Sequence, residues 1–492
     1  MIILIKVLQF ILSLSILVLI HEFGHFIAAK AFKTRVEKFY IFFDWGFSLF
    51  RCKKVNGQWQ FRFFSKNVPE KYTVSEYTDA QGKKQKNYDA IDLNTLPEDD
   101  WRRSDSTEYG IGWFPLGGYN KIAGMIDESM DKSQMQQPAQ PWEFRSKPAW
   151  QRFIIMVAGV FMNVLLAFVI YIGLLAKEGK SYLPTEQVNR YGISVDSLGY
   201  ELGLRDGDKI LAIDGQYVEN FSEIPMQIIL DKAKTVEVER NGKDTIINLP
   251  TDAVTKLLGS QDAHFITYRI PFIVAQVTAN SPGAAAGLQT GDAIIGINDI
   301  ETPYYQDFVK HIKQFKSQDV EIIVLRDGDT LPLAMHLTEE AVIGAYCNIS
   351  FADYYELETV DYTFWQAIPA GFNQTFDELG DYWKQVKLIF SPRTKAYESV
   401  GGFISIGKIF PDRWNWSMFW RLTAFLSIAL AVMNILPIPA LDGGFILFLL
   451  VEIITRRKPS DKFMEVAETV GLILVFALMI LANGNDIIRL FR

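Results

Sequence analysis

The chain has 492 residues, of which 49% are hydrophobic and 22% are charged, and its formal net charge is −8. This composition excludes a collagen-like chain, a long coiled coil and a mostly disordered protein, and its acidic balance argues against nucleic acid as a partner. The two cysteines, Cys52 and Cys347, are too few for a disulfide-stabilised scaffold or a four-cysteine zinc module.

The first predicted element is an apolar helix over residues 1–20, in which Lys6 is the single charged residue. This stretch fits either a secretory signal peptide or a transmembrane helix, since a bilayer core needs about 20 helical residues. Only Lys6 could serve as the basic region of a signal peptide, and no small-x-small cleavage site follows the apolar run. We therefore predict an uncleaved transmembrane helix that continues into His-Glu-Phe-Gly-His, within residues 1–31.

Residues 32–147 form the next segment, a cytoplasmic insert that is polar and charge-dense and shows little periodicity. Near its end, glycines alternate with aromatic residues between Gly110 and Tyr119. Such alternation is typical of a tight β-hairpin whose backbone approaches another group closely, although an ordinary hairpin turn has the same signature. The sequence assigns no role to residues 51–109 of this insert.

A second transmembrane helix is predicted for residues 148–180, because residues 153–176 contain no charged residue. An internal repeat follows, in which residues 202–214 match residues 286–298 at a constant offset of 84. A repeat of this period indicates two copies of one small domain. The spacing places these copies at 181–258 and 259–346.

The repeated pattern Gly-Leu-x-x-Gly-Asp-x-Ile resembles that of bacterial PDZ domains, which are small α+β domains. Ser281-Pro282-Gly283-Ala284, just before the second copy, strengthens this resemblance. PDZ domains capture extended peptides or chain ends by adding a strand to a sheet edge. The alternative, that both copies are only spacers or size filters, stays open at this point.

The remaining segments return the chain to the membrane. Residues 347–412 are predicted as a connector with an amphipathic helix, followed by a glycine-rich stretch around Gly401-Gly402. A third transmembrane helix is predicted at 413–444, because residues 422–438 are uncharged and tryptophans precede them. An interfacial helix and a fourth transmembrane helix are predicted within 445–492.

Clusters of basic residues predict the orientation of the four spans. With four spans, all three clusters fall on one side, which the positive-inside rule assigns to the cytoplasm. The N-terminus, both repeats and the C-terminus are then extracytoplasmic, and Cys52 and Cys347 lie on opposite sides and cannot form a disulfide. The clusters are Lys30, Lys33, Arg35 and Lys38; Arg145, Lys147 and Arg152; and Arg456, Arg457, Lys458 and Lys462.

The motif His21-Glu22-Phe23-Gly24-His25 lies at the cytoplasmic end of the first predicted span. Positions i and i+4 share one helix face, so both imidazoles can bind one Zn²⁺ with Glu22 beside them. The alternative is a pair of buried, hydrogen-bonded histidines. Ionisable groups in a membrane helix are costly and usually functional, so the motif favours a metal site.

A catalytic zinc needs a third protein ligand and an open position for water. Asp442 is the candidate, because it follows the third apolar span directly and a carboxylate there needs a partner. Pro437 and Pro439 break the helix before it, and Gly443 and Gly444 permit a sharp turn after it. An ordinary loop aspartate at the membrane interface is the alternative.

The His-Glu-x-x-His motif and the segment from Asn434 to Gly443 (Asn-x-x-Pro-x-Pro-x-Leu-Asp-Gly) resemble the site-2 protease family of intramembrane zinc metalloproteases. The tandem PDZ-like repeat narrows this resemblance to the branch of the regulator of sigma-E protease. Gly159-x-x-x-Asn163 also fits this family, and the Gly110–Tyr119 hairpin is similar to its membrane-reentrant β-loop. Phe445 and Phe403 replace residues common in the family, but neither position is a ligand in its scheme.

The resemblance implies the roles of the site residues. Zn²⁺ would be held by His21, His25 and Asp442, and Glu22 would act as general base and then as general acid. Asn434 would bind a freed backbone group of an unwound substrate, and Asn163 would either do the same or bridge two helices. The hairpin would pair with the substrate as an added strand through Gly112, Trp113, Gly117 and Gly118.

The expected protein therefore has four transmembrane α-helices with an intramembrane zinc site, plus two small α+β PDZ domains on the extracytoplasmic side. The resemblance implies a zinc metalloendopeptidase of the bacterial inner membrane that cleaves single-span membrane proteins within the lipid bilayer. Such substrates, for example anti-sigma factors in a stress response, would first be cut by an upstream site-1 protease. The same chemistry also fits clearance of remnant signal peptides or processing of peptide signals. A catalytically silent, membrane-anchored PDZ scaffold is the alternative from another class.

Overall fold

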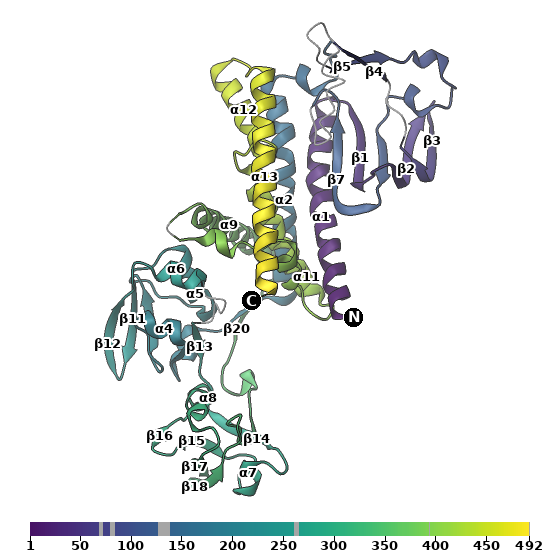
Figure 1. Cartoon of the computed structure of the whole chain (residues 1–492). Coiled ribbons are helices and arrows are strands. Elements are labelled where there is room, and N and C mark those ends of the chain that lie inside the picture. The colour runs from purple at the N-terminus through teal and green to yellow at the C-terminus, as the bar shows by residue number, and fades with distance from the viewer. Residues whose placement is uncertain (68–71, 79–83, 126–137, 260–264, 393, 492) are drawn as a thin grey trace. The chain divides into compact units, whose positions relative to one another are not determined.

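The structure is a computed structural model that describes residues 1–67, 72–78, 84–125, 138–259, 265–392 and 394–491 (Figure 1). The chain forms two compact units. The first comprises Met1–Glu178, Tyr362–Trp383 and Val400–Arg492, and the second comprises Gly179–Asp361 and Lys384–Ser399. Parts of the predicted insert (68–71, 79–83 and 126–137) and of the predicted second repeat (260–264) lie outside the described residues.

Within the described residues, four helices are long and apolar enough to cross a membrane. They are α1 (Ile2–Ala31), α2 (Ala149–Glu178), α11 (Trp416–Ile435) and α13 (Asp461–Leu490). Each reaches about 20 residues or more, the length that a helix needs to cross the hydrocarbon core. The four predicted apolar spans are therefore confirmed as helices, and the chain is a membrane protein.

The helix α2 contacts both α1 and α11. The approach to α1 is close because Gly24 has no side chain: a Cβ built there would lie 2.3 Å from the carbonyl oxygen of Ala158. Small residues and interhelical hydrogen bonds commonly join membrane helices. One such bond runs from the Ser427 hydroxyl of α11 to the backbone oxygen of Asn163 in α2, at 2.8 Å.

The third span ends sooner than predicted, so the predicted segment 413–444 contains parts of two helices. The helix α11 ends two residues before Pro437, and α12 (Asp442–Thr455) begins at Asp442. Proline lacks an amide hydrogen and keeps the preceding residue extended, which explains the break. At Gly443 a Cβ would lie 2.0 Å from a backbone oxygen of the preceding turn, so the turn has no room for a side chain.

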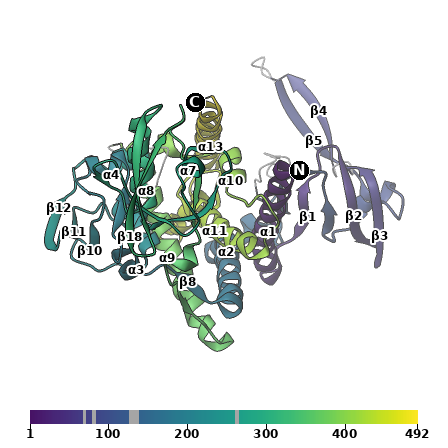
Figure 2. The same cartoon turned by 90° about the horizontal axis from the view of Figure 1, so that it is seen from below.

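A mixed sheet in the first unit lies beside α1 (Figures 1 and 2). The predicted insert thus contains strands that its weak periodicity did not predict. Two of them, β4 (Tyr72–Thr78) and β5 (Lys84–Ala90), pair only with each other and form a separate two-stranded sheet. The described strands of the sheet run in the order β3-β2-β6-β1-β7. They are β1 (Val36–Phe43), β2 (Phe47–Val55), β3 (Gln58–Lys66), β6 (Glu108–Ile111) and β7 (Phe114–Ile122).

The predicted hairpin between Gly110 and Tyr119 is wrong. The strand β6 pairs with β1 in parallel and β7 pairs with β1 in antiparallel fashion, so the two strands lie on opposite sides of β1. Their connection crosses the end of β1 at Gly112, where a Cβ would lie 2.2 Å from the carbonyl oxygen of Phe43. The alternation of residues identified strands, but it does not specify which neighbour a strand pairs with.

The second unit contains two domains with a similar order of elements, each with its own buried core. The first consists of α3 (Thr185–Asn189), β9 (Ile193–Val195), α4 (Ser197–Glu201), β10 (Lys209–Ile213), α5 (Ile224–Leu230), β11 (Thr235–Arg240), β12 (Lys243–Asn248), α6 (Ala253–Gly259) and β13 (Ile266–Tyr268). The second consists of β14 (Phe272–Val277), α7 (Pro282–Ala285), β15 (Ala293–Ile297), β16 (Ile300–Glu301), α8 (Tyr305–Ile312), β17 (Asp319–Arg326), β18 (Asp329–His336) and β19 (Ala345–Cys347).

Matching ion pairs show that the two domains share one fold. Asp208 accepts hydrogen bonds from Arg240 Nε and Nη2 at 2.8 and 2.7 Å. Asp292 accepts the same pair of bonds from Arg326 at 2.6 and 2.7 Å. The two aspartates belong to the repeated Gly-Asp motif and lie 84 positions apart, as do the ends of β10 and β15. The internal repeat in the sequence is thus a repeat of structure.

The remaining elements connect the units. The strand β8 (Lys180–Tyr182) pairs with β20 (Glu358–Val360), so the chain enters and leaves the two domains through paired strands. The predicted connector helix forms α9 (Phe364–Ile389), and the glycine-rich stretch leads into the short helix α10 (Phe403–Lys408). Cys52 and Cys347 are both free thiols.

Candidate metal centre

Three side chains that can bind a metal converge where the end of α1 meets the start of α12. The Oδ2 atom of Asp442 lies 3.1 Å from His21 Nε2 and 3.3 Å from His25 Nε2. The two Nε2 atoms are 3.3 Å apart. Within the part of the chain that the structure describes, no other group of three or more histidine, cysteine or acidic side chains has this arrangement.

The separations between these atoms match those around a tetrahedral zinc ion. Bonds of about 2.0–2.1 Å place the ligand atoms of a tetrahedral site about 3.3 Å apart. The Oδ2 atom of Asp442 is also buried, and among the described residues it accepts no well-formed hydrogen bond. A buried carboxylate oxygen without such a bond is costly unless a cation neutralises it. The three residues therefore fit zinc.

The ring of His25 is oriented by a backbone group of α2. Its Nδ1 atom lies 2.8 Å from the carbonyl oxygen of Ile155. Because that oxygen can only accept a hydrogen bond, Nδ1 carries the hydrogen and donates the hydrogen bond. A neutral imidazole that donates from one nitrogen has a lone pair on the other. The Nε2 atom of His25, which faces Asp442, is thus the metal-binding atom.

The ring of His21 contacts the predicted site residue Asn163. The side-chain Nδ2 atom of Asn163 lies 3.2 Å from His21 Nδ1, and the Oδ1 atom of the same amide is buried without a partner within the described residues. An amide can present either atom to a neighbour. With its oxygen turned toward His21, Asn163 would accept a hydrogen bond from the Nδ1–H group, and Nε2 would then carry the lone pair for the metal. Asn163 therefore lies at the centre and also bridges α2 to α11 through its backbone oxygen.

Gly159 is a site residue to which the sequence assigned no separate role. It lies one turn before Asn163 on α2, and a Cβ there would lie 2.4 Å from His25 Nε2 and 2.8 Å from His21 Cε1. Any side chain at this position would displace both rings. The spacing of four residues in Gly159-x-x-x-Asn163 was the available signal, because it places both residues on one helix face.

Glu22 and Asn434 lie at the same centre. The Glu22 side chain is partly buried, and its charge interacts with His25, His21 and Asp442. Asn434, in the last turn of α11, places its Nδ2 atom 3.4 Å from His21 Nε2. Its amide thus faces the metal-binding side of the ring, whereas Asn163 faces the opposite side.

The remaining predicted residues lie on the sheet. Gly117 and Gly118 line a narrow crevice between α1 and the sheet, opposite Ser15, Val18 and Leu19. The strand β7 that carries them is at the edge of the described sheet. Gly112 and Trp113 lie in the connection across the end of β1, and Trp113 Nε1 donates to the backbone oxygen of Trp45 at 2.9 Å. The predicted site residues are therefore divided between the metal centre and this side of the sheet.

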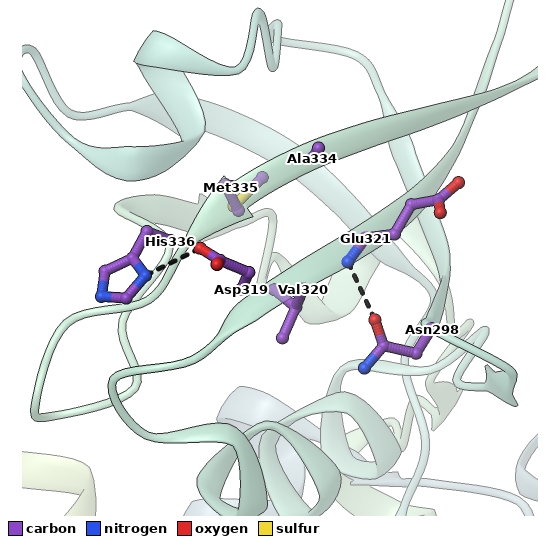
Figure 3. Close-up of a pocket in the computed structure, with 7 residues that line it drawn as sticks. All are labelled: Asn298, Asp319, Val320, Glu321, Ala334, Met335 and His336. Atoms are coloured by element: carbon purple, nitrogen blue, oxygen red, sulfur yellow. Dashed lines mark hydrogen bonds and ion pairs between the residues drawn. The ribbon is translucent and has the colours of Figure 1, made fainter.

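A separate hollow of about 500 Å³ lies on the second domain of the second unit (Figure 3). Figure 3 shows His336 directed toward Asp319, with His336 Nδ1 and Asp319 Oδ1 2.8 Å apart. These two side chains are 64% and 92% exposed, so the pair has the character of a surface contact. The lining residues are Asn298, Asp319, Val320, Glu321, Ala334, Met335 and His336.

Comparison with known proteins agrees with this chemistry. The model of peptidase family M50 matches residues 9–66 and 100–478, and the gap between these ranges falls in the predicted insert. The regulator of sigma E protease of Haemophilus influenzae is 24% identical over 98% of both chains. A Vibrio cholerae protein named as a zinc metalloprotease is 25% identical over 98% of both chains, and a similarly named protein of Rickettsia conorii is 25% identical over 99% of both.

Proposed function

The chain belongs to peptidase family M50 and is a zinc metalloprotease, and from this premise we propose that it cleaves single-span membrane proteins within or beside their membrane helix. His21, His25 and Asp442 are the proposed zinc ligands, and Glu22 is the proposed catalytic base. One observation carries this assignment: the three ligand atoms are 3.1–3.3 Å from one another at the end of an apolar helix.

The proposed chemistry divides between the metal and the chain. When bound, zinc supplies a Lewis acid that activates water and polarises the scissile carbonyl. Glu22 then accepts the proton of the attacking water on its carboxylate and delivers it to the nitrogen of the departing amine. Its place directly after His21 supports this role, because the carboxylate and the ligands share one helical turn.

A substrate helix must unwind before it can be cut, because its backbone groups are bonded to each other in the membrane. Two features support binding of the unwound segment. The amide of Asn434 faces the metal side of His21 and is placed to bond a freed backbone group. The edge strand β7, with Gly117 and Gly118 beside the crevice on α1, is suited to pair with an extended chain.

The proposed topology follows the basic clusters that flank the spans. The protein would lie in the bacterial inner membrane, with its N-terminus, its C-terminus and the second unit outside the cytoplasm. The two repeated domains are proposed to be PDZ domains that exclude substrates with bulky external parts. An upstream site-1 protease would remove those parts first, as the resemblance to the regulator of sigma E protease supports.

Two substitutions test the proposed function. Glu22→Gln should retain zinc and reduce cleavage of a single-span substrate by about 1,000-fold or more, because the proton acceptor is lost. Asp442→Asn should weaken zinc binding by more than the roughly 10- to 100-fold found when a residue that only orients a metal ligand is changed. Zinc content and cleavage are measured on purified protein in detergent. Cleavage that persists in Glu22→Gln would refute the mechanism, and unchanged zinc affinity in Asp442→Asn would remove Asp442 from the site.

A further inference from the structure

A buried ion pair joins α2 to α12 away from the metal centre. Arg152 Nη2 lies 2.5 Å from Glu452 Oε1, and the two side chains are 10% and 16% exposed. Arg152 Nε also donates to the backbone oxygen of Lys147 at 3.0 Å, so the guanidinium has a defined orientation. Charged groups between apolar helices are costly to bury, so this pair needs an explanation.

The ion pair and the metal centre lie on the same two helices. Along α12, Glu452 follows Asp442 by ten residues, or about 15 Å of helix. Along α2, Gly159 and Asn163 follow Arg152 by seven and eleven residues, or about 10 and 16 Å. The two helices are therefore antiparallel. When Glu452 meets Arg152, the carboxylate of Asp442 lies level with the turn of α2 that contacts both imidazoles.

Between these two points, apolar side chains join the helices. Ile446 and Leu449 of α12 share a buried cluster with Ile155 and Met156 of α2. Such contacts are not directional, so they tolerate a shift of α12 by one residue, about 1.5 Å, far better than a hydrogen bond does. The ligand separations of 3.1–3.3 Å leave no room for a shift of that size.

We propose that Arg152 and Glu452 are positioning residues, which set the register of α12 against α2 and thereby place Asp442 for metal binding. A charge-assisted hydrogen bond is short and depends on direction, so it specifies the register where the apolar contacts do not. Neither residue touches the metal centre, and both act through α12. This inference rests on the proposed role of Asp442 as a ligand.

The first test measures zinc affinity of the full-length protein by competition with a chelator. Arg152→Met and Glu452→Gln should each weaken zinc binding by about 10- to 100-fold, the range found for residues that orient metal ligands. The exchange variant, Arg152→Glu with Glu452→Arg, reverses the pair and should restore the affinity to within about threefold. Folded single variants with unchanged affinity, or an exchange variant that stays as weak as the single ones, would overturn the proposal.

The matched control removes an ion pair of similar burial elsewhere in the first unit. Arg102 Nη2 lies 2.8 Å from Asp100 Oδ2, and these side chains are 19% and 18% exposed. Both residues belong to one short 3-10 helix, Trp101–Arg103 with its N-cap Asp100, so the pair does not join two membrane helices. Arg102→Met should therefore leave zinc affinity unchanged. An equal loss in this variant would show a general effect of charge removal and would also overturn the proposal.

A second measurement, the distance between α2 and α12, depends neither on bound metal nor on catalysis. It therefore stays informative for variants that have lost activity. Spin labels at Ile154 of α2 and Leu447 of α12, which are 41% and 42% exposed, report the distance between the helices after Cys52 and Cys347 are replaced by alanine. In metal-free protein, each single variant should shift or broaden this distance distribution, and the exchange variant should restore it.

An unchanged distribution in the single variants would refute the register role. The assignment of Asp442 is tested separately, because Asp442→Asn changes zinc affinity only if Asp442 is a ligand. If Asp442 is not a ligand, the distance measurement still tests whether Arg152 and Glu452 set the register of α12. The failure of the proposed function and the failure of the register proposal therefore give different results.

Discussion

At the residue scale, the two imidazole rings are oriented through the nitrogens that face away from Asp442. The Nδ1 atom of His25 lies 2.8 Å from the carbonyl oxygen of Ile155, and that of His21 lies 3.2 Å from the amide of Asn163. A histidine whose outer nitrogen is bonded in this way keeps its tautomer and ring orientation. The helix α2 thus sets the orientation of both rings, although it supplies none of the three proposed ligands.

Gly159→Ala tests this orientation directly. The added methyl group would lie 2.4 Å from His25 Nε2, so the rings or α2 must move. Because a displacement of about 1 Å at such a centre is costly, we expect zinc affinity to fall by about 10- to 100-fold, with a parallel loss of cleavage. Zinc affinity by chelator competition is the primary measurement.

Gly173→Ala is the matched control, since Gly173 lies on the same helix and a Cβ there would meet no atom of a neighbouring segment within 4 Å. This variant should bind zinc as the unmodified protein does. If Gly159→Ala behaved like Gly173→Ala, the close packing of α2 against the imidazoles would have no role in metal binding.

At the element scale, a lysine on α8 connects the two domains of the second unit. Lys310 Nζ donates to Ser194 Oγ at 2.9 Å, and to Val195 O and Asp206 Oδ1 at 2.7 Å each. All three hydrogens of the ammonium group thus have acceptors on the first domain. This polar joint holds β9 and α8 together, and it depends on the charge of Asp206.

The charge of Asp206 predicts a pH dependence. Burial alone would raise the pKa of Asp206, but hydrogen bonds from Lys310 and Tyr200 outweigh it and hold this pKa below its ordinary value. A carboxylate with a lowered folded pKa stabilises the fold above its unfolded pKa of about 4, and this stabilisation is lost as the pH falls through the folded pKa. Hydrogen exchange of β9, corrected for intrinsic rates, should therefore rise below about pH 4.

Two substitutions isolate this effect. Asp206→Asn should raise exchange of β9 already at neutral pH and remove the step at low pH. Asp307 is a useful comparison, because burial raises its pKa and its protonation precedes that of Asp206 as the pH falls. Asp307→Asn should keep the low-pH step. If the low-pH rise in hydrogen exchange of β9 persisted in Asp206→Asn, another carboxylate would be responsible for it.

At the scale of the whole molecule, the metal centre and the repeated domains belong to different units. The chain leaves the first unit after α2 and returns to it at Tyr362, through the paired strands β8 and β20. Residues Lys384–Ser399, which include the end of α9, belong to the second unit again. The pairing of β8 with β20 brings together the chain segments that enter and leave the two repeated domains. The two domains can therefore be removed from the chain without disconnecting the elements that carry the candidate site.

Deletion of residues 185–345 tests the proposed size filter. Both β8 and β20 are retained, so their pairing can close the gap. We expect the shortened protein to cut single-span substrates that still carry a folded external domain at about 10-fold or more the rate of the full-length chain, since the filter acts by steric exclusion. Cleavage is followed on substrates with and without that domain, and Glu22→Gln in the shortened chain is the blank. Continued discrimination between the two substrates would show that the repeated domains have another role.

Part of this structure was predictable because the signals are local. Runs of about 20 uncharged residues predict membrane helices from composition alone. The spacing of His21 and His25 predicts a shared face within one helical turn, and Pro437 and Pro439 mark a break wherever they occur. The repeat predicted two similar domains. The position of a carboxylate directly after an apolar span indicated Asp442, and the family resemblance indicated Asn434. The structure brings both residues to the two histidines.

Other features depend on which segments meet, and a single sequence carries no such information. Strand alternation could not reveal that β6 and β7 flank β1, because a strand has the same period whichever neighbour it pairs with. The contact between Asn163 and His21 joins residues 142 positions apart, and the ion pair between Arg152 and Glu452 joins residues 300 apart. The sequence by itself determined the membrane helices, the repeat and the metal-binding residue types, whose signals lie within one turn or one span. Only the tertiary structure decided the strand order and how α2 orients the histidines and meets α12, because these result from packing between distant segments.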